Sequence, residues 1–198
     1  VILFALGSAT LPGGEPTPPA VSGKLETVNG LSVLSLWGTP RERGFAHGWL
    51  LAEEILEMMR EGLAPLVGQN GKPLAHLAPL LASGFTFSDE EIAEMEGLRD
   101  GIEKRFPGRK VPVLDKPLTL DEIKLLNTYG DWYALGCSSA ALWGKLTADG
   151  KPAVVRNFDF MALPYITRYQ HVGVVAAEPS KKSRGWVGVG LPASLGPV

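Results

Sequence analysis

The residues most capable of chemistry lie in the second half of the chain. Cys137 is the only cysteine among 198 residues, and it directly follows Gly136. Arg156 and Asp159 lie three positions apart, with Asn157 between them. A cysteine attacks a carbonyl carbon only as a thiolate, or with a base beside it that accepts its proton. We therefore interpret Cys137 as a candidate nucleophile, against the alternative that it is a small buried core residue.

Two kinds of base could serve this thiol. One is an imidazole, but the three histidines, His47, His76 and His171, show neither a neighbouring signature nor the spacing of metal ligands. The other is the α-amino group of Cys137 itself, which has an ordinary pKa of about 8 and becomes free only if the bond after Gly136 is cut. Glycine favours this second reading because it tolerates the strained backbone that self-cleavage needs.

A β-hairpin must position these residues. Residues of β type dominate segments 138–146 and 152–160, and Asp149–Gly150 between them is a two-residue turn signal. Further strands are predicted at 170–177 and 186–189. The pattern therefore predicts a β meander that begins at Cys137.

The second strand of this hairpin would bring Arg156 and Asp159 near Cys137. A guanidinium lowers the pKa of a thiol and can hold a carbonyl or carboxylate, while a carboxylate can accept hydrogen bonds from a newly formed ammonium group. Positions three apart face opposite sides of a flat strand, so both act only if a bulge or the strand end intervenes, and Asn157 then shares the site. The alternative is a local ion pair.

Upstream of Cys137 the sequence predicts a hairpin and three helices. Alternating residues 25–36 surround the turn signal Asn29–Gly30. One apolar stripe from 40 to 63 predicts a single helix, and capping-box patterns begin two more at Ser88 and Thr119. Three methionines are predicted to be core or helix-filling residues: Met58, Met59 and Met95. The five tryptophans are predicted to lie mostly in the core, with one or two lining an acyl pocket as the alternative: Trp37, Trp49, Trp132, Trp143 and Trp186.

Composition excludes several classes of protein. Nineteen basic and 21 acidic residues leave a formal net charge of −2, so no positive field attracts nucleic acid. A single cysteine forms no internal disulfide and no cysteine-rich zinc site, and we expect neither metal nor cofactor. No apolar run reaches the roughly 20 residues of a membrane span. We interpret residues 1–23 as a signal-like or linker segment, which would predict a secreted or periplasmic protein. The alternative is that the apolar run at its start is a first strand of the fold, and the protein would then be cytoplasmic.

These motifs together resemble the N-terminal-nucleophile hydrolases of the acyl-coenzyme A:6-aminopenicillanate acyltransferase type, peptidase family C45, which are related to choloylglycine hydrolases, acid ceramidases and phospholipase B-like proteins. The resemblance covers residues 30–178. Its matching segments are 38–48, 136–139, 143–145, 149–151 and 156–160.

The resemblance implies a precursor that cleaves before Cys137 and folds as an α+β, four-layer αββα sandwich. It assigns Cys137 as nucleophile and, through its amine, as base; Asp159 would position that amine, Arg156 would support the thiol or substrate, and Ser139 would help processing. The substrate would be a small amide or acyl compound. An ester hydrolase of the phospholipase B-like kind and an inactive ligand-binding relative are the alternatives.

The resemblance also divides the chain into parts. Segment 24–136 would be the α-rich part of the precursor, and 137–198 would begin the β part that carries the nucleophile. Family members supply an oxyanion-hole asparagine from further downstream. We therefore expect a second polypeptide from the same precursor to provide this donor and the remaining strands.

Overall fold

The computed structural model describes residues 19–67, 83–111, 114–132, 138–157, 164–178 and 185–196. Residues 1–18 lie outside these ranges, and they contain the apolar run on which the signal and first-strand predictions rest. Gly136, Cys137 and Asp159 also lie outside them. Within them, no helix is both long and apolar enough to cross a membrane.

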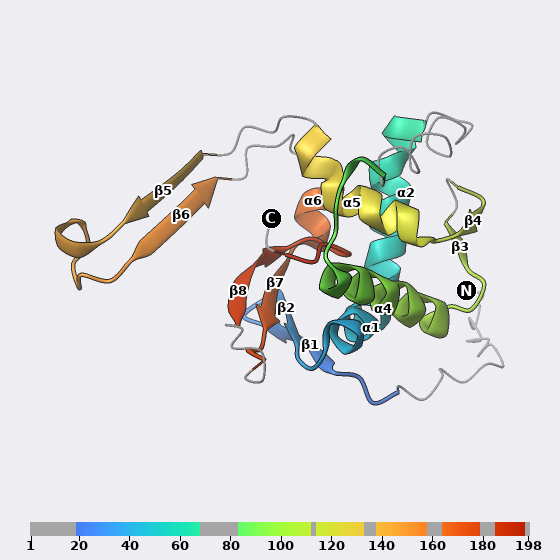
Figure 1. Ribbon diagram of the computed structural model, residues 1–198, viewed down its shortest axis with the longest axis horizontal. Coiled ribbons are helices and arrows are strands. Elements are labelled where there is room, and N and C mark those ends of the chain that lie inside the picture. The colour runs from blue at the N-terminus through green and yellow to red at the C-terminus, as the bar shows by residue number, and fades with distance from the viewer. Residues whose placement is uncertain are drawn as a thin grey trace, which may run out of the picture.

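Five α-helices, a four-stranded mixed sheet and two small hairpins make up the described residues, which confirms the α+β class (Figure 1). The helices are α1 (Pro40–Leu50), α2 (Ala52–Val67), α4 (Asp89–Arg105), α5 (Leu120–Trp132) and α6 (Pro164–Tyr169). The main sheet contains β1 (Gly23–Val28), β2 (Leu31–Leu36), β7 (His171–Val175) and β8 (Trp186–Gly190). The hairpins pair β3 (Lys110–Val111) with β4 (Lys116–Pro117), and β5 (Ser138–Leu142) with β6 (Ala153–Asn157).

The main sheet has the order β1-β2-β7-β8. Its first hairpin is the predicted one, and Asn29 and Gly30 turn it with φ of 50° and 81°. Strands β2 and β7 pair in parallel, and β7 and β8 pair antiparallel. The predicted meander from Cys137 onward is therefore wrong: β5 and β6 form a separate hairpin, whereas β7 and β8 extend the sheet that β1 and β2 begin. Parallel strands need a long crossover, and no local pattern signals such a pairing.

The apolar stripe predicted as one helix is divided between α1 and α2. Leu51 ends α1 with φ −113° and ψ 23°, although its N–H still donates to the His47 carbonyl at 3.0 Å. The stripe is buried on both sides of this junction, at Trp49, Ala52, Leu56 and Met59. The periodicity thus predicted the buried face correctly, but not the break within it.

Two helices begin where the sequence predicted capping boxes, and the reciprocal box is complete at Ser88. The Ser88 hydroxyl accepts a hydrogen bond from the Glu91 N–H, and the Glu91 carboxylate accepts one from the Ser88 N–H. At α5, the Thr119 N–H donates to Glu122 at 2.9 Å, and Lys116 binds the same buried carboxylate at 2.6 Å. Burial alone would raise the pKa of Glu122, but the bonds from Lys116 and Thr119 outweigh it and the pKa lies below its usual value.

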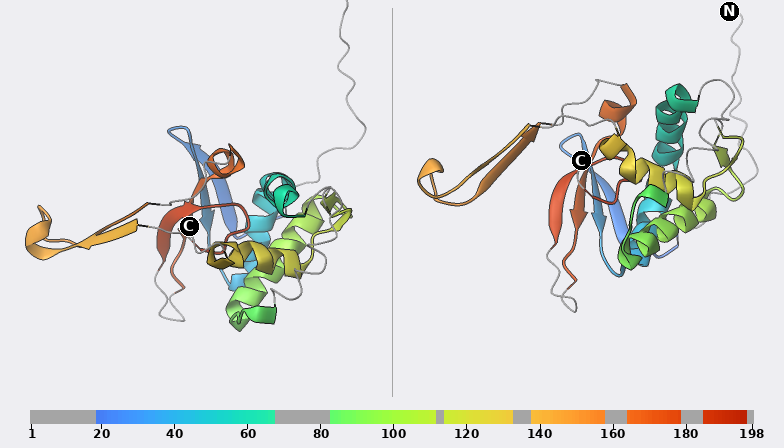
Figure 2. Two further views of the ribbon diagram at one scale, coloured as in Figure 1. Left: turned by 90° about the horizontal axis from the view of Figure 1, so that it is seen from above. Right: turned by 45° about the horizontal axis from the view of Figure 1, so that its top comes forward.

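Helices α1 and α4 cross in contact with each other (Figures 1 and 2). Their backbones lie so close at the crossing that only glycine fits between them. A Cβ on Gly44 or Gly48 of α1 would lie 1.9 or 2.0 Å from a backbone oxygen of α4. In return, a Cβ on Gly97 or Gly101 of α4 would lie 2.2 or 2.3 Å from a backbone oxygen of α1. Backbone atoms cannot rotate away as a side chain can, so each glycine is a steric requirement of this crossing.

Arginines of α1 bind carboxylates of α4 beside the crossing. Arg43 donates to Glu94 at 2.8 Å, and both side chains are largely buried. Burial raises the pKa of Glu94, against the opposing effect of Arg43. Arg41 binds Glu96 at 2.7 Å and also Asp100. The two helices are therefore joined by charge as well as by close packing.

The core lies between the main sheet and the helices. Leu34 and Leu36 of β2 point into it, and they cluster with Ala46, Ile55 and other buried residues of the helices. The opposite face of the sheet carries apolar side chains that stay at least partly accessible; we call it the valine face. Strand register assigns to it Val28, Leu31, Val33, Val172, Val174, Val187 and Val189.

The β5–β6 hairpin is confirmed, but its strands are shorter than predicted. They stop at Leu142 and resume at Ala153, and residues 158–160 lie outside the description. The connection contains a 3₁₀ turn at Gly144–Leu146 instead of a two-residue turn. Gly144 and Gly150 adopt φ of 61° and 73°, and the Gly144 N–H donates to the Gly150 carbonyl at 3.3 Å. A glycine at each end of the loop thus closes a wider connection than the Asp-Gly signal indicated.

The helix crossing generates a prediction for Gly48→Ala. The added Cβ has to push the α4 backbone away, and overpacking of this kind costs about 1–3 kcal/mol or more. We expect a lower free energy of unfolding, measured by urea denaturation. Gly62→Ala in α2 is the matched control, because its Cβ would lie no closer than 3.4 Å to Tyr165. The control should be neutral or gain roughly 0.5–1 kcal/mol from helix propensity; equal effects of the two substitutions would contradict the crossing.

Candidate functional site

The described part of the candidate site lies at one end of the β5–β6 hairpin. Ser139 pairs directly with Arg156, and Ser138 pairs directly with Asn157. Directly opposite residues of an antiparallel pair share a face, and neighbouring pairs alternate. The hairpin thus brings Ser139 and Arg156 together on one face, and places Asn157 on the other.

Three residues of the predicted site lie outside the described residues: Gly136, Cys137 and Asp159. In the sequence, Cys137 directly precedes Ser138, and Asp159 is the second residue after Asn157. The register therefore locates two of the predicted residues, Arg156 and Ser139, relative to each other. The geometry of the thiol and of the carboxylate stays a prediction.

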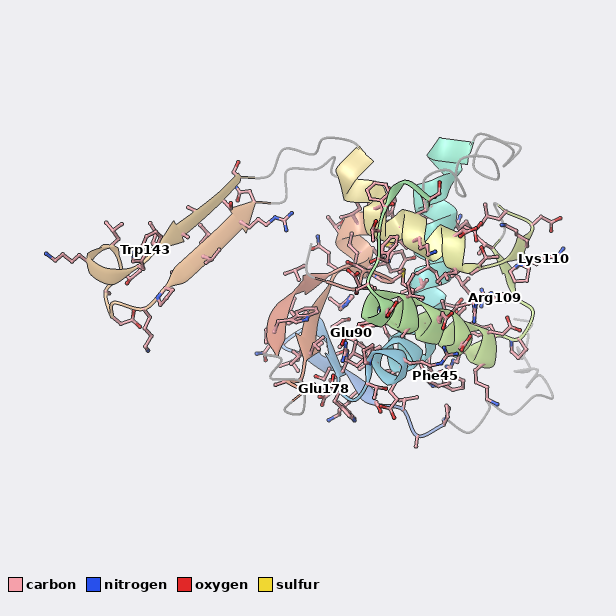
Figure 3. All side chains as sticks on the ribbon, viewed as in Figure 1. Phe45, Glu90, Arg109, Lys110, Trp143 and Glu178 are labelled. Atoms are coloured by element: carbon pink, nitrogen blue, oxygen red, sulfur yellow. The ribbon has the colours of Figure 1, made fainter. Side chains whose placement is uncertain are left out.

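The hairpin projects from the rest of the described structure (Figures 1 and 2). Every residue of β5 and β6 is exposed, including large apolar ones such as Val154, which is 73% exposed. Trp143 lies at the far end of the hairpin and is 65% exposed (Figure 3). The prediction that Trp143 and Trp37 lie in the core is wrong for the described arrangement, whereas Trp49 is buried as expected.

Two of the three histidines meet in the interior, which the sequence did not reveal. His47 of α1 and His171 of β7 are buried, with ring centroids 5.9 Å apart and the rings edge to face. Burial and, to a smaller extent, the charge of His171 together lower the pKa of His47 to about 3. Burial also lowers the pKa of His171. Both imidazoles are therefore neutral near pH 7. The sequence did not predict their contact, because no sequence spacing relates a helix residue to a strand residue more than a hundred positions later.

The histidine alternative for the catalytic base stays untested. His76 and Cys137 lie outside the described residues, so no distance joins an imidazole to the thiol. A base with a pKa near 3 is also a poor proton acceptor at neutral pH. In the described ranges, no three side chains of histidine, cysteine, aspartate or glutamate gather as a metal ion requires.

Comparison of the chain with protein-family models finds no match, and comparison with curated proteins finds none either. The assignment of a function therefore rests on the residues and the hairpin geometry.

The register generates a prediction that oxidation can test. In a Cys137→Ala background, Ser139→Cys combined with Arg156→Cys should form a disulfide, because the two side chains lie directly opposite on one face and a small backbone shift brings their Cβ atoms within disulfide range. The matched control combines Ser139→Cys with Val155→Cys, which point to opposite faces of the hairpin. Mass spectrometry of peptides after mild oxidation measures both. Equal yields from the two pairs would contradict the register.

Proposed function

We propose that the chain is a cysteine N-terminal-nucleophile hydrolase or acyltransferase that acts on a small linear amide. The observation that carries this proposal is the β5–β6 register, which pairs Ser139 with Arg156 at the end of the hairpin that adjoins the Gly136–Cys137 bond. A single thiol, a preceding glycine and a guanidinium on the neighbouring strand are the parts that such chemistry needs.

The proposed reaction has two stages. Cleavage between Gly136 and Cys137 first frees an amine on the residue that carries the thiol. The thiolate of Cys137 then attacks the amide carbon of the substrate, and a thioester forms as the carbon–nitrogen bond breaks. The amine of Cys137 takes the thiol proton and passes it to the leaving nitrogen. Water or an acceptor amine then attacks the thioester, which releases the acyl group and restores the thiol.

Arg156 and Asp159 have supporting roles in this scheme. The Arg156 guanidinium favours the thiolate over the thiol, because an opposite charge nearby lowers the pKa of an acid. Asp159 accepts hydrogen bonds from the ammonium form of the freed amine and thereby holds it near the sulfur. Neither residue exchanges a proton with the substrate.

We also propose that the protein completes a four-layer αββα sandwich. The main sheet has helices on one side and the accessible valine face on the other, and the β5–β6 hairpin is exposed on both faces. Apolar sheet faces of this kind are normally covered by a second layer. A second polypeptide from the same precursor would supply that layer and the oxyanion donor.

Autoproteolysis is the first prediction from this proposal. Incubated complete precursor should give one fragment that ends at Gly136 and another that begins at Cys137, whereas its Cys137→Ala variant should stay intact. Intact-mass measurement and N-terminal sequencing record the cut. Cys137→Ser keeps a hydroxyl nucleophile and should cleave more slowly, while Ser138→Ala controls for a change beside the junction. Persistent intact wild-type protein after long incubation would favour an inactive binding relative.

Thiol reactivity gives the second prediction. In cleaved protein, Arg156→Gln should slow the alkylation of Cys137 by iodoacetamide near neutral pH, because less of the thiol is ionised. Lys151→Gln removes one positive charge at the other end of the hairpin and should leave the rate unchanged. If both substitutions slow alkylation equally, or neither does, Arg156 has no specific effect on the thiol.

A further inference from the structure

The buried histidines hold a segment that the proposed chemistry does not use. Residues 191–196 follow β8 and run back toward α1 and α5. The Ala193 N–H donates to Nε2 of His47 at 3.3 Å. Nε2 must therefore be unprotonated, because a protonated nitrogen cannot accept a hydrogen bond.

Asn127 of α5 binds the same segment twice. Its Nδ2 donates to the Ala193 carbonyl at 2.9 Å, and its Oδ1 accepts from the Leu195 N–H at 2.9 Å. Ala193 is fully buried and has a φ of 68°, which residues with a side chain rarely adopt. Three hydrogen bonds thus hold the segment in a conformation that it would not favour on its own.

His171 lies against the strand end from which this segment departs. It pairs directly with Gly190, the last residue of β8, and a Cβ on Gly190 would lie 2.9 Å from Nε2 of His171. Nδ1 of His171 is buried and makes no hydrogen bond. Both ring nitrogens of a charged histidine carry protons that need acceptors. The surroundings of His171 therefore favour a neutral imidazole over a charged one.

No described carboxylate compensates a charge on either ring. The only charge that acts on His47 among the described residues is that of His171, and the Tyr169 backbone is the only group that favours protonation of His171. On α4, which packs along α1, the buried carboxylate of Glu94 is bound to Arg43. Asn127, the α5 side chain that binds residues 191–196, carries no charge.

We propose that His47 and His171 form an acid-operated latch: as neutral rings they hold residues 191–196 against α1 and α5, and a proton on either ring releases the segment. A proton on Nε2 of His47 replaces an acceptor by a donor that faces the Ala193 N–H. A proton on His171 places a buried charge against Gly190, and only the Tyr169 backbone favours it among the described residues. The latch does not depend on the proposed function.

The sign of the pH dependence follows from the depressed pKa values. The latched state binds fewer protons than the released state, in which a histidine has its ordinary pKa of about 6.5. Latching is therefore complete above about pH 6.5 and weakens as the pH falls below it. Between about pH 7.5 and pH 5, the ratio of released to latched protein should rise about thirtyfold for each histidine that is neutral only when latched.

Amide hydrogen exchange of the wild-type protein tests this directly. Protection factors correct for the intrinsic effect of pH on exchange, so they can be compared between pH 7.5 and pH 5. We expect the Ala193 and Leu195 amides to lose at least tenfold in protection at the lower pH, while those of Leu98 and Ile102 in α4 lose far less. Unchanged protection of Ala193, or an equal loss throughout the core, would overturn the latch.

Two variants assign the effect to the imidazoles. His47→Gln keeps a side-chain acceptor for the Ala193 N–H but cannot be protonated, so it should remove the contribution of His47 to the loss of protection. Its control is His76→Gln, which removes the third histidine and should leave the pH dependence as in wild type. An unchanged pH dependence in folded His47→Gln protein would overturn the proposal. If that variant fails to fold, NMR titration of wild type decides, because the latch requires both pKa values to lie below 6.5.

Discussion

The backbone contact between α1 and α4 is the constraint on which the described structure depends. Four glycines allow two helices that are distant in sequence to meet backbone to backbone, and the buried pair of Arg43 and Glu94 fixes their relative position. Helix α1 also packs on β1 and β2, so its placement sets the position of the sheet. A shift of this helix would move both the core beneath β2 and the imidazole of His47.

The local elements were predictable because their signals are local. Asn29–Gly30 favours a tight turn whose twist matches that of the two flanking strands. Each capping box provides hydrogen-bond partners for N–H groups that the first turn of a helix leaves unpaired. The pairing of β2 with β7 was not predictable, because the alternation of Val172 and Val174 fits a strand in any sheet. The spacing of Gly44 and Gly48, matched by Gly97 and Gly101, was the one readable sign of the helix crossing.

The sequence predicted that two paired strands form the candidate site, but not how their residues align. Two strands around a turn imply a register, and a two-residue turn at Asp149–Gly150 would pair Ser139 with Phe160. The wider loop shifts this register by four residues, so that the structure pairs Ser139 with Arg156 instead. The histidine pair had no such signal: it joins a helix to a strand through tertiary packing alone.

The end of β8 connects the latch with the uncovered face of the sheet. Gly190 lies against His171 on the helix side of the sheet, while Val187 and Val189 of the same strand project from the valine face. A second layer packed on that face would hold β8 in place and with it the start of residues 191–196, so it would bind the latched state more tightly than the released one. By linkage, such a layer would lower the pKa of the two histidines further, and their protonation would weaken its binding by the same factor. In the proposed latch, the close contact of His171 with Gly190 is thus the point at which a proton inside the molecule would act on the valine face.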